Sequence, residues 1–146
     1  MGKRRFKPVS TILLLFLALF CGLAGGAAFG QDDPAKPPAR TALVRAVICE
    51  GIEAYAPFNP AVVFSLSMGK VSCFTEFDPV THETVIYHKW YFHDRLTTRK
   101  KLTLKPPRWA TFSSIQLRQE DKGPWRVEVV DGSERVIDVL RFSITD

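Results

Sequence analysis

The chain has 146 residues, of which 46% are hydrophobic and 24% charged, and its formal net charge is +5. This length suits one domain and is short for two. Four of the 20 basic residues lie within the first seven positions, which leaves 16 basic against 15 acidic side chains in the rest of the chain. The folded part therefore lacks the strong basic excess of nucleic-acid-binding domains, and we expect no nucleic-acid partner.

The first 30 residues have the pattern of an export signal. A basic start at residues 3–7 precedes the apolar run ILLLFLALF and a series of small residues that ends at Gly30. Ala28 and Gly30 fit the −3 and −1 positions of a signal-peptidase site, although the same stretch is long enough to remain as a membrane anchor. In both cases the rest of the chain is exported. We therefore expect a periplasmic domain, or one anchored in the inner membrane outside the cytoplasm.

Residues 31–41 follow as a proline-rich tether, and residues 42–146 form the predicted domain. Short β-branched and aromatic segments alternate there with turn residues, which is typical of strands. The prolines of APFNP and KPPRW interrupt the pattern, and DGSE predicts a hairpin turn. We predict strands over residues 42–52, 62–68, 71–77, 84–93, 97–104, 110–117, 125–130 and 136–144. Eight short strands at this spacing indicate an all-β, antiparallel sandwich or barrel.

Two cysteines, Cys49 and Cys73, lie within this domain. An even number of cysteines in an oxidising compartment favours a disulfide between them. The alternative is a pair of buried free thiols, each acting as a small hydrophobic residue.

The segment YHKWYFH, residues 87–93, has the highest density of side chains capable of chemistry. Because side chains alternate along a strand, His88 shares a face with Trp90, and His93 shares the other face with Tyr87 and Tyr91. The two imidazoles then point in opposite directions and cannot hold one ion. No cysteine or acidic residue stands at zinc-ligand spacing, so we expect neither a metal nor a cofactor. His88 is predicted to be a core histidine whose ring nitrogens bind a backbone or hydroxyl group.

A candidate binding surface combines the exposed face of this segment with the basic residues that follow it. Aromatic side chains with polar tips suit contacts with sugars or peptides, and a basic cluster suits anionic headgroups or glycans. The alternative is ordinary cross-strand pairing, with lysines that discourage pairing at a sheet edge. The candidate residues are Tyr87, Tyr91, His93, Arg95, Arg99, Lys100 and Lys101.

Catalytic patterns are weak. Ser113 and Ser114 lack the glycines of a nucleophile elbow, and no two carboxylates stand at a spacing that pairs them for acid–base chemistry. We expect no catalytic residues.

Five segments together resemble one known family: VSCF at 71–74, YHKWY at 87–91, LTL at 102–104, RWATFSS at 108–114 and GPWRVEVVD at 123–131. Over about residues 44–146 the chain is similar to the bacterial family catalogued as domain of unknown function 2914. The resemblance implies a small extracytoplasmic β domain, often after a hydrophobic segment, and implies no activity. We expect its motif residues to be structural, namely His88, Trp90, Arg108, Trp109, Ser113, Trp125 and Arg126.

The last hairpin and the strand of Trp90 also look immunoglobulin-like, which predicts an antiparallel immunoglobulin-like sandwich of about seven to eight strands. Both cysteines precede Trp90, whereas in immunoglobulin domains the tryptophan lies between them, so a bridge between Cys49 and Cys73 would be a different one. We expect a non-catalytic binding domain for an envelope protein or an anionic envelope polymer. The alternatives are a cell-envelope hydrolase with a histidine base and a purely structural spacer.

Overall fold

The fold is seen in a computed structural model that describes residues 39–146. The predicted signal or anchor, residues 1–30, and residues 31–38 of the predicted tether lie outside the described residues. None of the helices between residues 39 and 146 is long and apolar enough to cross a membrane.

Nine strands and two short 3₁₀ helices make up the described chain. They are β1 (Leu43–Glu53), β2 (Ala56–Pro60), β3 (Val63–Ser65), η1 (Leu66–Met68), β4 (Lys70–Phe77), β5 (Thr84–Phe92), β6 (Arg95–Leu104), β7 (Trp109–Gln116), η2 (Gln119–Asp121), β8 (Gly123–Asp131) and β9 (Val136–Thr145). Each predicted strand overlaps an observed one, because alternation and turn residues set both ends of most segments.

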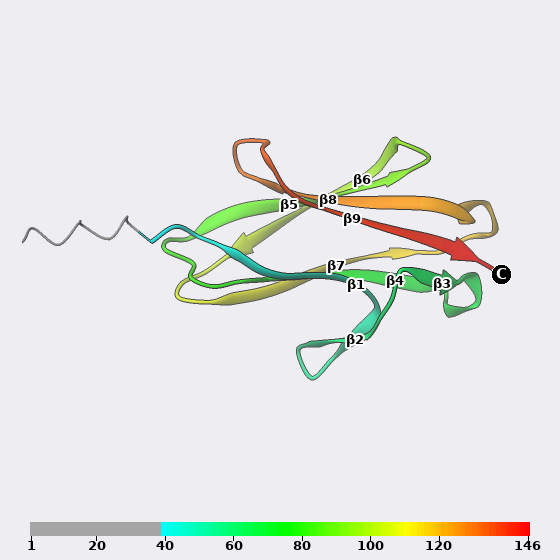
Figure 1. The fold of residues 1–146 in the computed structure, drawn as a ribbon, viewed down its shortest axis with the longest axis horizontal. Helices are drawn as coiled ribbons and strands as arrows, with labels where there is room; N and C mark the ends of the chain where they lie inside the picture. Colours follow the sequence, from blue (N-terminus) through cyan, green and yellow to red (C-terminus); the bar gives the residue numbers. More distant parts are fainter. Residues whose placement is uncertain (1–38) are drawn as a thin grey trace, which may run out of the picture. The chain divides into compact units, whose positions relative to one another are not determined.

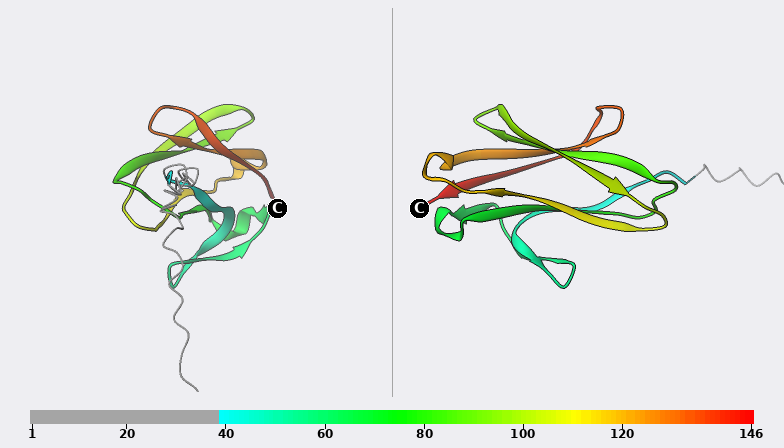
Figure 2. Two further views of the ribbon diagram at one scale, coloured as in Figure 1. Left: turned by 60° about the vertical axis from the view of Figure 1, so that its left-hand side comes forward. Right: turned by 180° about the vertical axis from the view of Figure 1, so that it is seen from behind.

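The strands form two sheets that pack face to face as two layers (Figures 1 and 2). One sheet has the order β2-β1-β4-β7, and the other has the order β3-β9-β8-β5-β6. The predicted immunoglobulin-like β-sandwich is confirmed, since β9-β8-β5 follow the order G-F-C and β5 bonds to β4 and β7 across the core. One pair departs from the antiparallel prediction, because β3 runs parallel to β9.

Strand β2 was not predicted. Its sequence APFNP contains two prolines, which we interpreted as a break in the chain. Proline cannot donate a hydrogen bond to a sheet but is tolerated at an edge. β2 pairs only with β1 and lies at the edge of the four-stranded sheet, so its prolines are accommodated there. The β1–β2 hairpin extends away from the lower layer in Figure 1.

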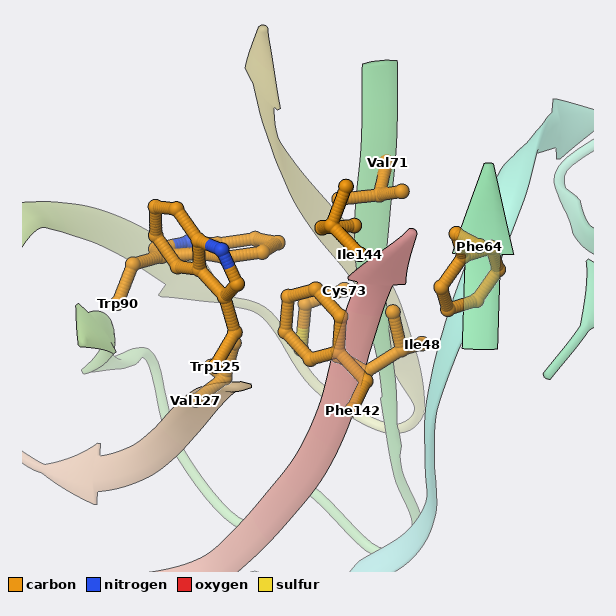
Figure 3. Packing of buried hydrophobic residues seen from close by; sticks show 9 residues of the cluster. All are labelled: Ile48, Phe64, Val71, Cys73, Trp90, Trp125, Val127, Phe142 and Ile144. Carbon is orange, nitrogen blue, oxygen red and sulfur yellow. The ribbon is translucent and has the colours of Figure 1, made fainter. Parts of the chain in front are cut away.

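Aromatic side chains from the five-stranded sheet fill the centre of the core (Figure 3). Trp90 meets Phe142 edge to face, with ring centroids 6.1 Å apart, and Trp125 stacks on the same Phe142 ring at 6.1 Å. The Trp125 indole N–H donates to the carbonyl of Asp121 at 2.7 Å, so its polar atom is satisfied. This packing supports the interpretation of Trp90 and Trp125 as structural residues.

The predicted disulfide is not formed, and both cysteines are free and buried. In the β1–β4 register Cys73 lies opposite Ile48, whereas Cys49 lies opposite Ser72. Opposite residues share a face, so the two thiols point to opposite sides of the sheet. The Cys49 thiol donates instead to the Ser72 carbonyl at 3.6 Å, and burial raises the pKa of both thiols.

Candidate functional site

Strand β5 turns one row of side chains into the core and the other row to the surface. Trp90 and His88 have no exposed area, while Tyr87 and Tyr91 on the outer row are partly exposed. The predicted alternation is thus confirmed along β5. It ends at His93, which lies beyond the strand in a two-residue turn with Asp94, where φ is 44° and 61°. Positive φ at both positions is the geometry of a tight hairpin turn, so His93 does not continue the tyrosine row.

The inner row of β5 carries a buried polar network that joins the two sheets. His88 Nε2 lies 3.1 Å from Thr75 Oγ1 on β4, and His88 Nδ1 lies 2.8 Å from Ser113 Oγ on β7. The Trp90 indole N–H donates to the same Ser113 Oγ at 3.0 Å. Within the described residues no buried side-chain nitrogen or oxygen is left without a partner. The network therefore satisfies its own members and ties β5 to β4 and β7.

One direction in this network is fixed, because an indole nitrogen only donates. Ser113 Oγ accepts from the Trp90 N–H and also bonds His88 Nδ1, while His88 Nε2 bonds Thr75 Oγ1. Either tautomer of the neutral ring can satisfy both hydroxyls, because each hydroxyl can donate or accept. Burial lowers the pKa of His88 to about 4, because the charged imidazolium would lose its hydration. The ring is neutral at neutral pH.

His88 and Ser113 are residue types that can serve as a base and a nucleophile, but their burial keeps a substrate from reaching them. His88 has no exposed area and Ser113 is 7% exposed. The Ser113 oxygen already accepts the indole N–H, and no carboxylate of the described residues bonds the imidazole. Within residues 39–146 no group of three or more His, Cys, Asp or Glu side chains is placed to hold a metal ion. The arrangement supports the interpretation of His88 and Ser113 as structural residues.

On the outer row each tyrosine ring is covered by a guanidinium group. Arg99 lies 3.7 Å from the centroid of Tyr87, and Arg126 lies 4.0 Å from that of Tyr91. Glu134 pairs with Arg99, and it also pairs with Lys89. These cation–π and ionic contacts hold the long side chains flat on the sheet, so a partner would meet the edges of the rings and the arginine stems.

Arg126 and Arg108 each bind carboxylates as well. Arg126 pairs with Asp94 and, at 3.2 Å, with Glu128, and Arg108 binds Glu76 through two nitrogens. Trp109, which follows Arg108, is half-buried against the core cluster that includes Phe77 and Leu104.

The pKa of the Tyr91 phenol is raised. Desolvation is the main cause, and the neighbouring Glu128 carboxylate is the second.

The structure divides the candidate binding surface into three parts. Tyr87 and Tyr91 share the outer face with Arg99 and Lys101, since Lys101 lies opposite Tyr87 in the β5–β6 register. Lys100 lies opposite His88 and therefore projects on the other side of β6. There it lines a cavity of about 440 Å³, with β7 along its other wall. The third part is the turn with His93, and Arg95 begins β6 next to it.

Unpaired positive charge concentrates on β6, which is an edge strand. Four exposed basic side chains on or directly after β6 have no acidic partner within the part of the chain that the structure describes. They are Arg95, Lys100, Lys101 and Lys105. In contrast, Arg99 of the same strand is paired with Glu134, and Arg108 after the strand is paired with Glu76. This edge of the five-stranded sheet is the part of the predicted surface that an anionic group could meet.

Arg141 was not singled out from the sequence. It lies opposite Arg126 in the β8–β9 register, and both line a cavity of about 320 Å³ with Tyr91 and His93. The alternation of VLRFSI does place Arg141 on the exposed face. Its position beside Arg126 depends on the hairpin register, which the irregularity between Val129 and Val130 shifts. That shift left no sign in the sequence.

Residues 83–144 match the model of the family described as Protein of unknown function (DUF2914). The predicted resemblance is thereby confirmed for strands β5–β9, whereas β1–β4 lie outside the DUF2914 match. No curated protein matches the chain.

Two crystal structures of a beta-glucosidase from Listeria innocua show local similarity to the chain. The structure in complex with isofagomine has a TM-score of 0.40, and a second one has 0.37, both at 14% identity and over 71% of this chain. The chain spans 16% of the length of those enzymes. Identities and TM-scores at this level are too low for any property of the glucosidase to be assigned to this chain.

Proposed function

We propose that the sandwich is an extracytoplasmic, non-catalytic binding domain for an envelope protein or an anionic envelope polymer. The observation that carries the proposal is the unpaired basic edge of β6 beside the tyrosine-lined outer face. A cluster of uncompensated positive charge attracts anionic partners and excludes cationic ones. The export pattern of the first 30 residues supports a place outside the cytoplasm.

The interior of the domain gives catalysis little support. The histidine with the most hydrogen bonds, His88, is sealed between the sheets and has a lowered pKa because of its burial. Its position is explained by the inter-sheet network alone. The exposed features, in contrast, carry charge over several strands, which suits contact with a large partner.

The test compares partners recovered from envelope extract by the full chain and by two triple variants. The first variant is Tyr91→Ala, Lys100→Glu, Lys101→Glu, which removes the proposed contact. The matched control is Tyr55→Ala, Arg40→Glu, Lys70→Glu, which makes the same chemical changes at exposed sites away from β6. We expect wild type and control to recover the same partners and the first variant to lose them. Identical partners for all three would instead favour the structural spacer.

One observation favours the hydrolase as a second candidate. His93 and Asp94 both line the cavity of about 320 Å³, together with Tyr91. No hydrogen bond joins the His93 ring to a carboxylate within the described residues, and no serine or cysteine lines this cavity. Release of soluble fragments from cell-wall material by the wild type, but not by a His93→Asn variant, would replace the binding proposal with the enzymatic one.

A further inference from the structure

We propose that strand β7 is a docking edge for an extended acidic segment of a partner protein, which adds to the four-stranded sheet as a further strand. This inference deepens the proposed function and rests on it, because it selects a protein partner over a polymer and names the mode of contact. Main-chain hydrogen bonds at a sheet edge supply affinity in such complexes, and alternate side chains supply specificity.

The sandwich has four sheet edges, and three of them carry features that discourage a further strand. β2 contains two prolines, and β3 has only three residues. β6 carries several basic side chains, and its pairing with β5 has a register irregularity opposite Trp90/Tyr91. Short length, proline, lysine and bulges all protect an edge from pairing with another chain. These three edges are therefore blocked in different ways.

β7 has none of these protections. Its sequence WATFSSIQ contains no charged residue and no proline, and its eight residues pair with β4 from Lys70 to Phe77 without a register shift. On its other side β7 has no neighbouring strand, and within residues 39–146 no backbone hydrogen bond from a loop reaches that side. An unpaired edge of this length presents alternate N–H and C=O groups that another strand can bind.

The centre of β7 also exposes an aromatic ring. Phe112 is 49% exposed on the outer face of the four-stranded sheet, although it lies opposite the buried Phe74. A strand added beside β7 would place its own side chains against this ring, and burial of apolar area is the main favourable term in association. The outward-facing residues of the partner segment should therefore be apolar.

The other face of the added strand would meet positive charge. The cavity of about 440 Å³ between β6 and β7 is lined by Lys100 and Arg118, with Ile115 from the inner face of β7 on its wall. Lys100 has no acidic partner within the described part of the chain, and the one partner of Arg118, Glu120, is 3.8 Å away and exposed. Asp121 also lines the cavity but already accepts the backbone N–H of Arg118 at 2.7 Å. Alternate residues of the partner should therefore be acidic.

A second copy of the chain fits this edge less well. Pairing of β7 with β7 of another copy would bring two β6 strands to the same side of the joined sheet. Each β6 carries unpaired basic side chains, and like charges placed together oppose association. Charge complementarity thus selects a segment that alternates acidic and apolar residues.

The experiment measures binding of two labelled decapeptides to the full chain by fluorescence anisotropy. One peptide alternates glutamate with valine, and the other alternates lysine with valine. We expect the glutamate peptide to bind at least tenfold more tightly. In hydrogen exchange it should protect the amides of residues 109–116. Equal affinities, or protection located elsewhere, would overturn the proposal.

Three variants locate the contact. Phe112→Lys places a protective lysine on β7 and should weaken binding of the glutamate peptide at least tenfold, whereas Phe58→Lys, at a ring with similar exposure on β2, should leave it unchanged. Lys100→Glu should reverse the preference between the peptides. Both phenylalanines are partly exposed, so unchanged thermal unfolding can verify that the variants fold. Equal binding by the two lysine variants would refute the role of β7.

Two further results separate this proposal from the proposed function. Sedimentation that shows a dimer of the chain, lost in Phe112→Lys, would assign the edge to a second copy and overturn the partner segment. If envelope partners depend on Lys100 and Lys101 but persist with Phe112→Lys, the edge proposal alone fails. If the peptide binds through β7 but envelope extract yields no partner, the proposed function fails instead.

Discussion

The two rows of strand β5 place similar chemistry in opposite environments. His88 and Trp90 on the inner row are fully buried and make three side-chain hydrogen bonds across to β4 and β7. Tyr87 and Tyr91 on the outer row contact arginines that water can also solvate. A buried polar group that loses its partner finds no substitute, whereas an exposed group finds water. Mutations on the inner row should therefore affect stability, and those on the outer row should affect binding.

The largest effect is expected from removing His88. His88→Ala should lower the free energy of unfolding by about 4 kcal/mol, because it leaves a cavity and also removes partners of Thr75 and Ser113. Urea denaturation followed by tryptophan fluorescence measures the change. The matched variant on the other face of the strand, Tyr91→Ala, should cost about 1 kcal/mol or less, since it removes an exposed cation–π contact. Similar losses for the two variants would contradict the comparison.

The stability of the fold should also depend on pH through His88 of the inner row. The native pKa of His88 is about 4, below the ordinary value of 6.5. Between these values the unfolded chain binds a proton that the native protein does not, so stability falls as the pH falls. The full contribution is present above pH 6.5, and about 3 kcal/mol should be lost by pH 4. Urea midpoints at half-unit pH intervals would show this slope.

A His88→Gln variant isolates this contribution, because glutamine can hydrogen-bond but does not titrate. Its stability should change little between pH 6.5 and 5.

Two surface carboxyls affect the stability only at lower pH. The backbone N–H of Arg135 lowers the pKa of Asp131, and a hydrogen bond from Lys89 lowers that of Glu134. Their stabilisation is lost only below their ordinary values of 3.8 and 4.5. A slope that persists in His88→Gln between pH 6.5 and 5 would assign it to another group.

The sequence predicts which way the side chains of a strand point better than it predicts which residues they contact. Alternation correctly assigned His88 and Trp90 to the core, because burial of one face requires a period of two. It also predicted a hydroxyl or backbone partner for His88. Thr75 and Ser113 could not be identified as those partners, since their positions depend on which strands of the opposite sheet lie across from β5.

The surface was predicted less well because local turns and bulges interrupt the alternation. The turn at His93 and Asp94 takes His93 out of the tyrosine row. Alternation within β6 itself separates Lys100 from Lys101, although both were assigned to one basic patch. The significance of β7 depends on the sheet order, which identifies it as an edge strand. A single sequence gives strand periodicity but does not show which strands remain unpaired.

A smaller effect separates two neighbouring serines. Ser113→Ala should lower the free energy of unfolding by about 2 kcal/mol, because the Trp90 indole N–H and His88 Nδ1 both lose their partner inside the core. Ser114 points to the other face of β7, where its hydroxyl contacts that of Ser72 at 2.7 Å in a partly exposed position. Ser114→Ala should therefore cost about 1 kcal/mol, because it removes one hydrogen bond, whereas Ser113→Ala removes two. A cost for Ser114→Ala equal to that for Ser113→Ala would show that the network contributes no more than a single hydrogen bond on the outer face of β7.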